Sequence, residues 1–185
     1  TRDMQSAHLR LTGTLTDGQL RVNAPQQKLK VVLGGAAIAS KSSAGVYVVS
    51  ADSVKLILRD GTANSISDGA SYGADGSEPS AALFSNGDLK IFGEGTGSLT
   101  VTGNSVDGIA CDDDLLIKAG ALTVTAKDDA IRGKDSLTVE GGVVTATAST
   151  GHALKSDNEV DVGAGVISIQ GGALTLKSTS ADGVH

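Results

Sequence analysis

The chain has 185 residues, enough for one domain with a substantial core, and its 25 glycines against 2 prolines favour an all-β chain with many turns. The formal net charge is −6, from 15 basic and 21 acidic residues, so there is no excess of positive charge to neutralise the phosphates of a nucleic acid. No apolar run approaches the roughly 20 residues of a membrane helix, and we expect no membrane insertion.

The first part of the chain, residues 1–33, carries short alternating runs that predict N-terminal strands. Turns are expected at Gly13 and at Asp17–Gly18. Because the sequence begins at Thr1 without a methionine, we expect a mature or excised segment. Strands are predicted over His8–Leu11, Gln19–Val22, Leu29–Leu33, Ala36–Ile38, Gly45–Val48 and Val54–Leu58.

Residues 61–80 form the longest polar, glycine-rich stretch, and apolar residues become sparse there. Such composition is typical of a segment that runs over the surface and does not pack in a core. We therefore expect a surface loop at 61–80.

From Leu83 onward a repeat becomes explicit. An aliphatic residue, which we call the peg, follows an acidic or small residue at Ile109, Ile131, Leu154 and Val184, with spacings of 22, 23 and 30 residues. Repeats of this length built from short strands are typical of a solenoid, and the frame of a leucine-rich repeat is missing. The sequence therefore predicts one parallel β-helix domain over 1–185, with coils of about 22–23 residues in the C-terminal half.

Pairs of short strands fill the intervals between the pegs. In the last interval we expect an additional strand at Leu174–Leu176 to account for the greater length. The predicted pairs are Leu115/Ile117 with Leu122/Val124, Leu137/Val139 with Val144/Ala146, and Val160/Val162 with Val166–Ile169.

Acidic residues recur at fixed distances from the pegs, so in a β-helix they would stack at about 4.8 Å. Stacked carboxylates repel unless a cation lies between them, and Ca²⁺, which takes six to eight oxygens, fits this need. The alternative is that these are ordinary solvated turn residues. The alignment predicts calcium ligands at Asp107, Asp113, Asp129, Asp135, Asp157 and Asn158.

Basic residues stand beside these acids. Arg132 and Lys155 occupy successive places in one column, and Lys134 lies close by in sequence. With bound calcium, they would suit a polymer that bears carboxylates, since a guanidinium binds a carboxylate in a bidentate way. The alternative is that they form salt bridges with neighbouring aspartates.

Threonines form a second outward pattern, Thr-x-Thr, which on a flat solenoid face is an arrangement suited to ice. The competing explanation is the ordinary preference of threonine for exposed strand positions, and we expect the pattern to end at Ser168 and Gln170 in the next coil. The pairs are Thr100/Thr102, Thr123/Thr125 and Thr145/Thr147.

Soft-metal chemistry has little support in the sequence. The single cysteine, Cys111, excludes an internal disulfide and is expected to be a buried thiol. The three histidines, His8, His152 and His185, do not approach a zinc-binding spacing.

Three runs carry a resemblance to a known family: LILRDGTANSISDGASY, EPSAALFSNGDLKIFGEGTGSLTVTGNSVDGIA and LTVTAKDDAIRGKDSLTVEGG. From about Leu11 to Asn158 the chain resembles the bacterial carbohydrate-binding parallel β-helix family, extracellular proteins that bind cellulose and acidic plant sugars. The resemblance implies a right-handed parallel β-helix similar in shape to pectate lyases, with calcium held by turn aspartates. It also implies a protein that is secreted or anchored at the cell surface.

The family's calcium ligands lie in DDAI-x-GKD turns, which here correspond to Asp128, Asp129 and Asp135, together with Asp107 from the matching VDGI turn. One coil later the chain departs from this pattern, because Gly151–His152 replaces the acidic pair.

We therefore expect an extracellular, non-catalytic module that binds acidic polysaccharide of the polygalacturonate type, and also cellulose. One alternative is a calcium-dependent polysaccharide lyase, in which Lys155, Lys134 or Arg132 would remove the C5 proton of a uronate. Another is an architectural or adhesin solenoid. The sequence stops inside a repeat at 182–185, so we expect a missing C-terminal cap and self-association through the open end.

Overall fold

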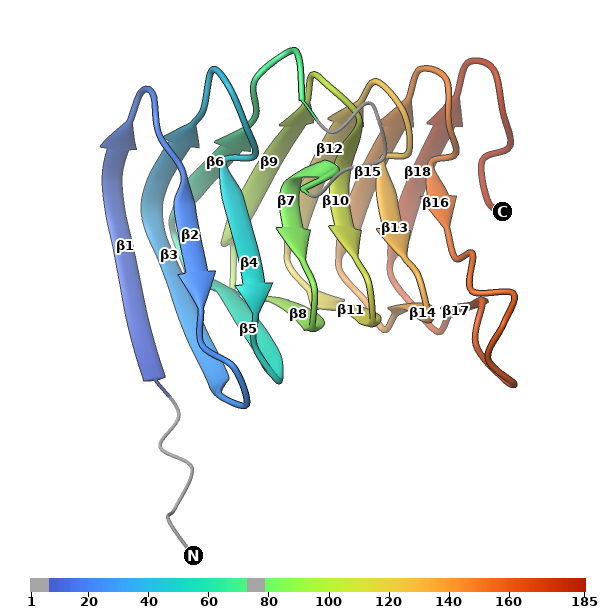
Figure 1. The fold of residues 1–185 in the computed structure, drawn as a ribbon, viewed down its shortest axis with the longest axis horizontal. Coiled ribbons are helices and arrows are strands. Elements are labelled where there is room, and N and C mark those ends of the chain that lie inside the picture. Colours follow the sequence, from blue (N-terminus) through green and yellow to red (C-terminus); the bar gives the residue numbers. More distant parts are fainter. Residues whose placement is uncertain (1–6, 73–78) are drawn as a thin grey trace, which may run out of the picture.

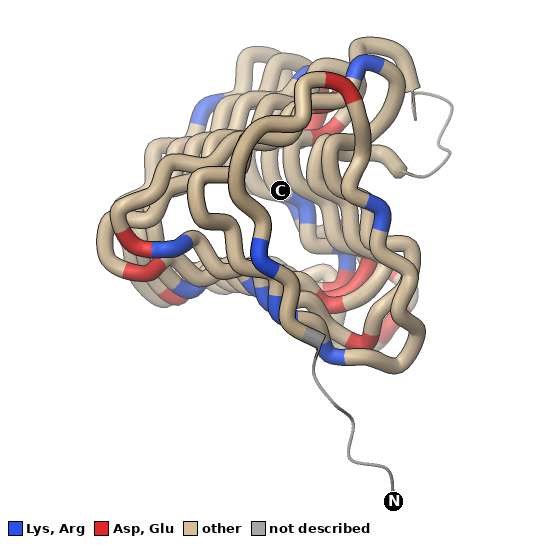
Figure 2. The backbone as a smooth tube through the Cα atoms, turned by 90° about the vertical axis from the view of Figure 1, so that its left-hand side faces the viewer, with Lys and Arg blue, Asp and Glu red and all other residues tan. Residues whose placement is uncertain are grey.

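The computed structural model describes residues 7–72 and 79–185, and this part of the chain is an all-β parallel solenoid of about six turns. Each complete coil contributes three strands, and the stacked coils form a triangular prism (Figures 1 and 2). The predicted parallel β-helix is confirmed. No helix in the described residues is long and apolar enough to cross a membrane.

One side of the prism is a six-stranded parallel sheet. Its strands are β2 (Leu20–Asn23), β4 (Val46–Ser50), β7 (Ala81–Ser85), β10 (Asp107–Cys111), β13 (Ile131–Gly133) and β16 (Leu154–Lys155).

The other two sides form one twelve-stranded sheet, because the long strand β3 (Lys28–Ala39) runs around a corner and pairs on both sides. The first of these sides continues with β5 (Ser53–Leu58), β8 (Asp88–Gly93), β11 (Asp114–Ala119), β14 (Ser136–Val139) and β17 (Val166–Ile169). The second contains β6 (Ala63–Ser67), β9 (Ser98–Gly103), β12 (Ala121–Ala126), β15 (Val143–Ala148) and β18 (Ala173–Ser178), and β1 (Ala7–Leu15) pairs with β3 at the N-terminal end.

Period-2 alternation explains why these segments are strands. In β12, Leu122, Val124 and Ala126 point inward and are buried, while the threonines between them are exposed. The pegs stack as the spacing predicts, since Ile109 pairs with Ile131 and Ile131 with Leu154. An isolated bridge adds Val184 to the column, so the register of the repeat is confirmed.

Glycines make one corner of the prism possible. Gly120, Gly142 and Gly172 have φ of +108°, +96° and +99°, a left-handed conformation that other residues rarely adopt. A Cβ at Gly142 would also lie 2.6 Å from the carbonyl oxygen of Gly120. Only glycine therefore allows successive coils to turn this corner in register.

The predicted surface loop at 61–80 is wrong in its first part, because residues 63–67 form β6. The prediction took polar residues as a sign of a surface loop, but the polar side chain of Asn64 occupies a buried position. It accepts hydrogen bonds there from the backbone N–H groups of Gly35 and Ala36. Ile66 supplies the inward apolar residue and is 1% exposed. Residues 73–78, and residues 1–6 of the N-terminal prediction, lie outside the described part of the chain.

The strand predicted at Val160 and Val162 is also wrong. Both side chains are exposed in the turn between β16 and β17, which contains Gly163 and Gly165 with positive φ. This turn accounts for the long last repeat, since the strand at 173–178 is not additional and pairs with β15 as its counterpart.

The threonine columns are real but continue differently from the prediction. Thr145 and Thr147 pair with Thr175 and Lys177 of β18, whereas Ser168 belongs to another side of the prism and pairs with Thr138. A lysine therefore interrupts one of the two columns.

We expect Ile131→Ala to destabilise the fold strongly, because the side chain is 0% exposed in the middle of the peg column. The cavity would cost about 2–5 kcal/mol of unfolding free energy in chemical denaturation. Val143→Ala, at a position 56% exposed in β15, is the control and should cost less than about 0.5 kcal/mol. Similar losses in the two variants would contradict the core assignment.

Candidate functional site

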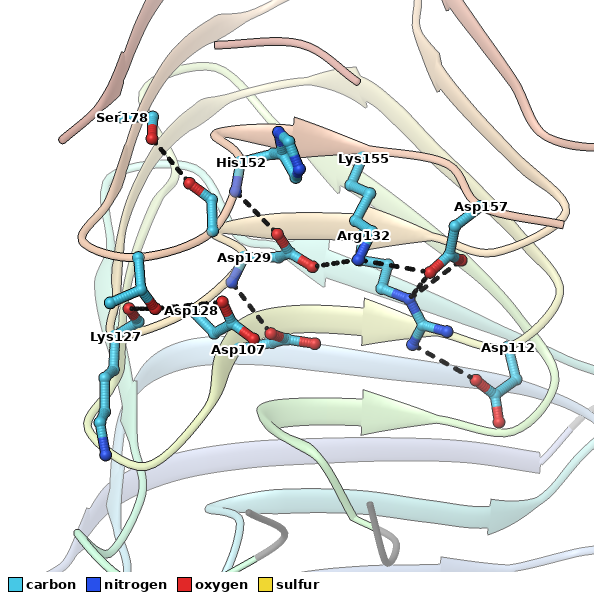
Figure 3. Close-up of polar contacts among 12 residues, drawn as sticks. Asp107, Asp112, Lys127, Asp128, Asp129, Arg132, His152, Lys155, Asp157 and Ser178 are labelled. Atoms are coloured by element: carbon cyan, nitrogen blue, oxygen red, sulfur yellow. Dashed lines mark hydrogen bonds and ion pairs between the residues drawn. The ribbon is translucent and has the colours of Figure 1, made fainter. Parts of the chain in front are cut away.

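Three predicted acids meet where the strands of the six-stranded sheet begin. Oxygens of Asp107, Asp128 and Asp129 all lie within 4.8 Å of one another, and the three residues come from two adjacent coils (Figure 3). Asp107 and Asp129 are 4% and 3% exposed, while Asp128 is half-buried. We call this group the acidic cluster.

Backbone hydrogen bonds hold the acidic cluster in place. The N–H of Asp129 donates to Oδ1 of Asp107 at 3.0 Å, and the N–H of His152 donates to Oδ1 of Asp129 at 2.7 Å. The hydroxyl of Thr150 donates to Oδ1 of Asp128 at 3.2 Å. Each carboxylate is thus anchored by the coil that follows it.

Gly151 provides the space for these carboxylates. A Cβ at this position would lie 2.4 Å from Oδ1 of Asp129 and 2.6 Å from Oδ1 of Asp128. The sequence departure at 151–152 therefore opens room beside the acids of the preceding coil. Carboxylate oxygens that lie within 4.8 Å of one another fit a hard cation such as Ca²⁺, and these three residues would hold it.

Burial makes the acidic cluster electrostatically strained in the absence of a cation. Desolvation, followed by the charge of Asp129, raises the pKa of Asp107 to about 8, although the N–H of Asp129 and the charge of Arg132 oppose the shift. Asp107 therefore holds a proton at neutral pH unless a cation replaces it.

The basic residues Arg132 and Lys155 lie next to the acidic cluster on the outside of the six-stranded sheet (Figure 3). Nε of Arg132 donates to both oxygens of Asp157 at 3.1 Å, and a second guanidinium nitrogen lies 3.7 Å from Asp112. Nζ of Lys155 lies 2.9 Å from Asp129 and 3.5 Å from Asp157. The salt bridges considered from the sequence are thus present.

These ion pairs set the protonation of the site. Burial alone would lower the pKa of Lys155, but the hydrogen bond to Asp129 and the nearby carboxylates raise it above its ordinary value. Burial would raise the pKa of Asp157, but the hydrogen bond from Arg132 and the two cations lower it. Lys155 is therefore held as an ammonium and Asp157 as a carboxylate.

The remaining predicted ligands lie apart from the acidic cluster, where the strands of the six-stranded sheet end. Burial, and then the charge of Asp135, raise the pKa of Asp113. Asn158 donates from Nδ2 to Asp135 at 2.6 Å, and its oxygen accepts two backbone N–H groups of its own turn. Lys134 lies in this same region, after β13, and its carbonyl accepts the N–H of Asn158.

Two features escaped the sequence analysis. Asp112, a partner of Arg132, is not among the predicted site residues. His152 and His185 have no zinc-binding spacing in the sequence, yet their rings stack with centroids 4.3 Å apart and lie near Asp182. The alignment of the repeats on the pegs could have indicated this group, because Asp182 and His152 both stand two residues before a peg.

We expect Asp107→Asn to stabilise the chelator-treated protein at pH 8. The raised pKa means that the folded state keeps a proton which the unfolded state loses above about pH 4, so the wild type loses stability as the pH rises from about 4 to 8. Asparagine still accepts the N–H of Asp129 but carries no charge. The melting temperature should rise by at least about 2–4 °C.

The same comparison at pH 4 is the control, because there the folded wild type holds the proton and about half of the unfolded chains also hold it, so the gain should shrink. A gain that is equal at pH 4 and pH 8 would contradict the pKa assignment.

Comparisons with known proteins agree with this architecture. A family model described as carbohydrate-binding domain-containing protein matches residues 4–185. A protein of the same description from Acetivibrio thermocellus is 36% identical over 119 residues, which cover 62% of this chain and 41% of that protein. The match therefore spans about two fifths of the length of this relative.

A solved structure also resembles this chain. It is the gadolinium derivative of a polysaccharide lyase-like protein from C. thermocellum, and it superposes with a TM-score of 0.88 at 28% identity over 98% of this chain and 79% of the other. With its whole described length inside the family match, the chain belongs to the carbohydrate-binding domain family.

Proposed function

We propose that the chain binds an acidic polysaccharide of the polygalacturonate type on the outer side of the six-stranded sheet, with Ca²⁺ at the acidic cluster. The observation that carries the proposal is the meeting of three carboxylates within 4.8 Å, beside the half-buried cations Arg132 and Lys155. The ion would neutralise the cluster and offer a ligand position to a sugar carboxylate. We also propose cellulose as a second polymer, and a secreted or surface-anchored location, where such polymers occur.

The family supports carbohydrate as the ligand class, and two observations support a hard cation. The oxygens of the acidic cluster lie within 4.8 Å of one another, and the lack of a side chain at Gly151 leaves room for two of these carboxylates. The related solved structure is a gadolinium derivative, and gadolinium, like calcium, is a hard ion that prefers oxygen ligands.

Arg132 and Lys155 would contact the polymer, but both already form ion pairs with aspartates of the protein. These aspartates are Asp112, Asp129 and Asp157. A uronate that approached them would compete with these aspartates, so the two cations add less than free ones would. In this proposal the calcium ion therefore contributes most of the affinity for carboxylates.

A calcium-dependent lyase is the second candidate, since the related structure is described as polysaccharide lyase-like. Abstraction of the C5 proton needs an unprotonated base. Lys155 fits poorly, because Asp129 holds its pKa above the ordinary value. Binding without cleavage is therefore the function that this geometry supports better. An architectural or adhesin solenoid remains the candidate if no glycan is retained.

We expect calcium to raise the melting temperature of the wild type, and Asp128→Asn to remove most of this rise. Asp128 is the half-buried member of the cluster, so its substitution disturbs the core least. Asp52→Asn is the control, because it also replaces one carboxylate by an amide, but at an exposed position that pairs with Lys28 in a different coil. The same calcium response in Asp128→Asn and Asp52→Asn would contradict the assignment of the ion to the acidic cluster.

We expect polygalacturonate to bind the calcium-loaded protein in calorimetry and to lose at least about tenfold in affinity after chelation. Arg132→Lys, which keeps the charge but loses the planar fork, should weaken binding several-fold without changing the calcium response. Polymer binding that is unaffected by chelation would refute the calcium-dependent mode. A calcium-dependent rise of ultraviolet absorbance from unsaturated product would instead establish the lyase.

A further inference from the structure

The last coil brings His152, Asp182 and His185 together. His152 precedes β16, whereas Asp182 and His185 follow β18, and the bridge between Leu154 and Val184 joins the two segments. Around this bridge the N–H of Leu154 donates to Gly183, the N–H of His185 to Leu154, and the N–H of Ser156 to His185, at 3.0, 3.0 and 3.1 Å. Backbone pairing therefore fixes the spacing of the three side chains.

The three side chains are placed as metal ligands would be. One ring nitrogen of each histidine and one oxygen of Asp182 all lie within 4.8 Å of one another. Asp182 and His185 are exposed and His152 is half-buried, so an ion can enter from solvent. The rings are stacked, with 16° between their planes, and they must open slightly, because the lone pair of a ring nitrogen lies in the ring plane.

An unpartnered atom supports a ligand at this place. Within the described structure, Nδ1 of His152 is buried and has no hydrogen-bond partner. Buried polar atoms are nearly always paired. A metal ion bound at Nδ1 would give this atom a partner. A rotation of the ring on metal binding, which brings Nδ1 to the solvent, would do the same.

The donor set differs in kind from that of the acidic cluster. Along the column that contains Asp107 and Asp129, the next coil has His152, and in the column of Arg132 and Lys155 the last coil has His185. Imidazole nitrogen suits Zn²⁺ and its neighbours in the transition series, whereas Ca²⁺ takes oxygen.

The local charge also permits a cation. Lys155 is the closest positive residue in the column of His185, and it is already paired with Asp129 and Asp157. Asp182 contributes a carboxylate to the donor set. The site thus offers two imidazole nitrogens and one carboxylate oxygen.

We propose that His152, Asp182 and His185 bind a borderline divalent metal ion such as Zn²⁺ at the C-terminal end of the six-stranded sheet. Three protein ligands leave a fourth position open for water or for a ligand from outside. This site is separate from the calcium site proposed at the acidic cluster and does not depend on it.

Titration of chelator-treated protein with ZnCl₂, in buffer with excess CaCl₂, tests the proposal. We expect one zinc ion per chain, an affinity at least about tenfold weaker in His185→Ala, and a smaller loss in Asp182→Asn. His8→Ala, which removes a histidine from β1 at the opposite end of the solenoid, should bind zinc as the wild type does. Melting temperatures without zinc would confirm that the variants are folded.

Three results would overturn the assignment: no zinc binding by the wild type, zinc affinity that is unchanged in both His185→Ala and Asp182→Asn, or zinc binding that is lost in Asp128→Asn. The last would place zinc at the acidic cluster. Loss of the calcium response in Asp128→Asn with zinc binding retained would show that the two sites are independent.

Discussion

The hydrogen-bonded register between parallel coils is the constraint on which the rest of this structure depends. Each coil repeats the preceding one at the spacing of neighbouring strands, about 4.8 Å, so a residue stacks on its counterpart one repeat away. Ile109, Ile131 and Leu154 form a buried column in this way. The same register aligns whatever lies on the outside, and it therefore builds the charged site as directly as it builds the core.

Like apolar residues stack favourably in the core, whereas like charges that stack on the outside repel. The chain reduces this repulsion because the residue type changes from coil to coil within a column. Asp107 and Asp129 lie in successive coils, but His152 replaces the acid in the third, and its backbone N–H satisfies Asp129. Lys155 neutralises the same carboxylate from the neighbouring column. Asp107, Asp128 and Asp129 still gather within 4.8 Å of one another, and this is where we propose the calcium ion.

The two candidate metal sites follow from one geometric rule applied to different residues. At the acidic cluster, two coils supply carboxylates and Gly151 supplies space. Further along the solenoid, the column of Asp107 and Asp129 supplies His152 and Asp182, and the column of Arg132 and Lys155 supplies His185. Both sites lie along the six-stranded sheet, so a long polymer that follows the solenoid axis would pass them in turn.

The repeat, the pegs and their register could be predicted from the residues alone, because each coil carries the period of 22–23 residues in its own sequence. The same alignment placed Asp107 and Asp129 in one column, and the family resemblance added Asp128. Tertiary structure alone decided the rest: that Asn64 fills a core position, that Val160 and Val162 lie in an exposed turn, and that Asp113 and Asp135 belong to a different edge from Asp107. It also decided that His185 reaches His152. These features could not be predicted because turns of different length can join strands that pair in the same register. Residues far apart in the sequence therefore become neighbours only when the coils stack.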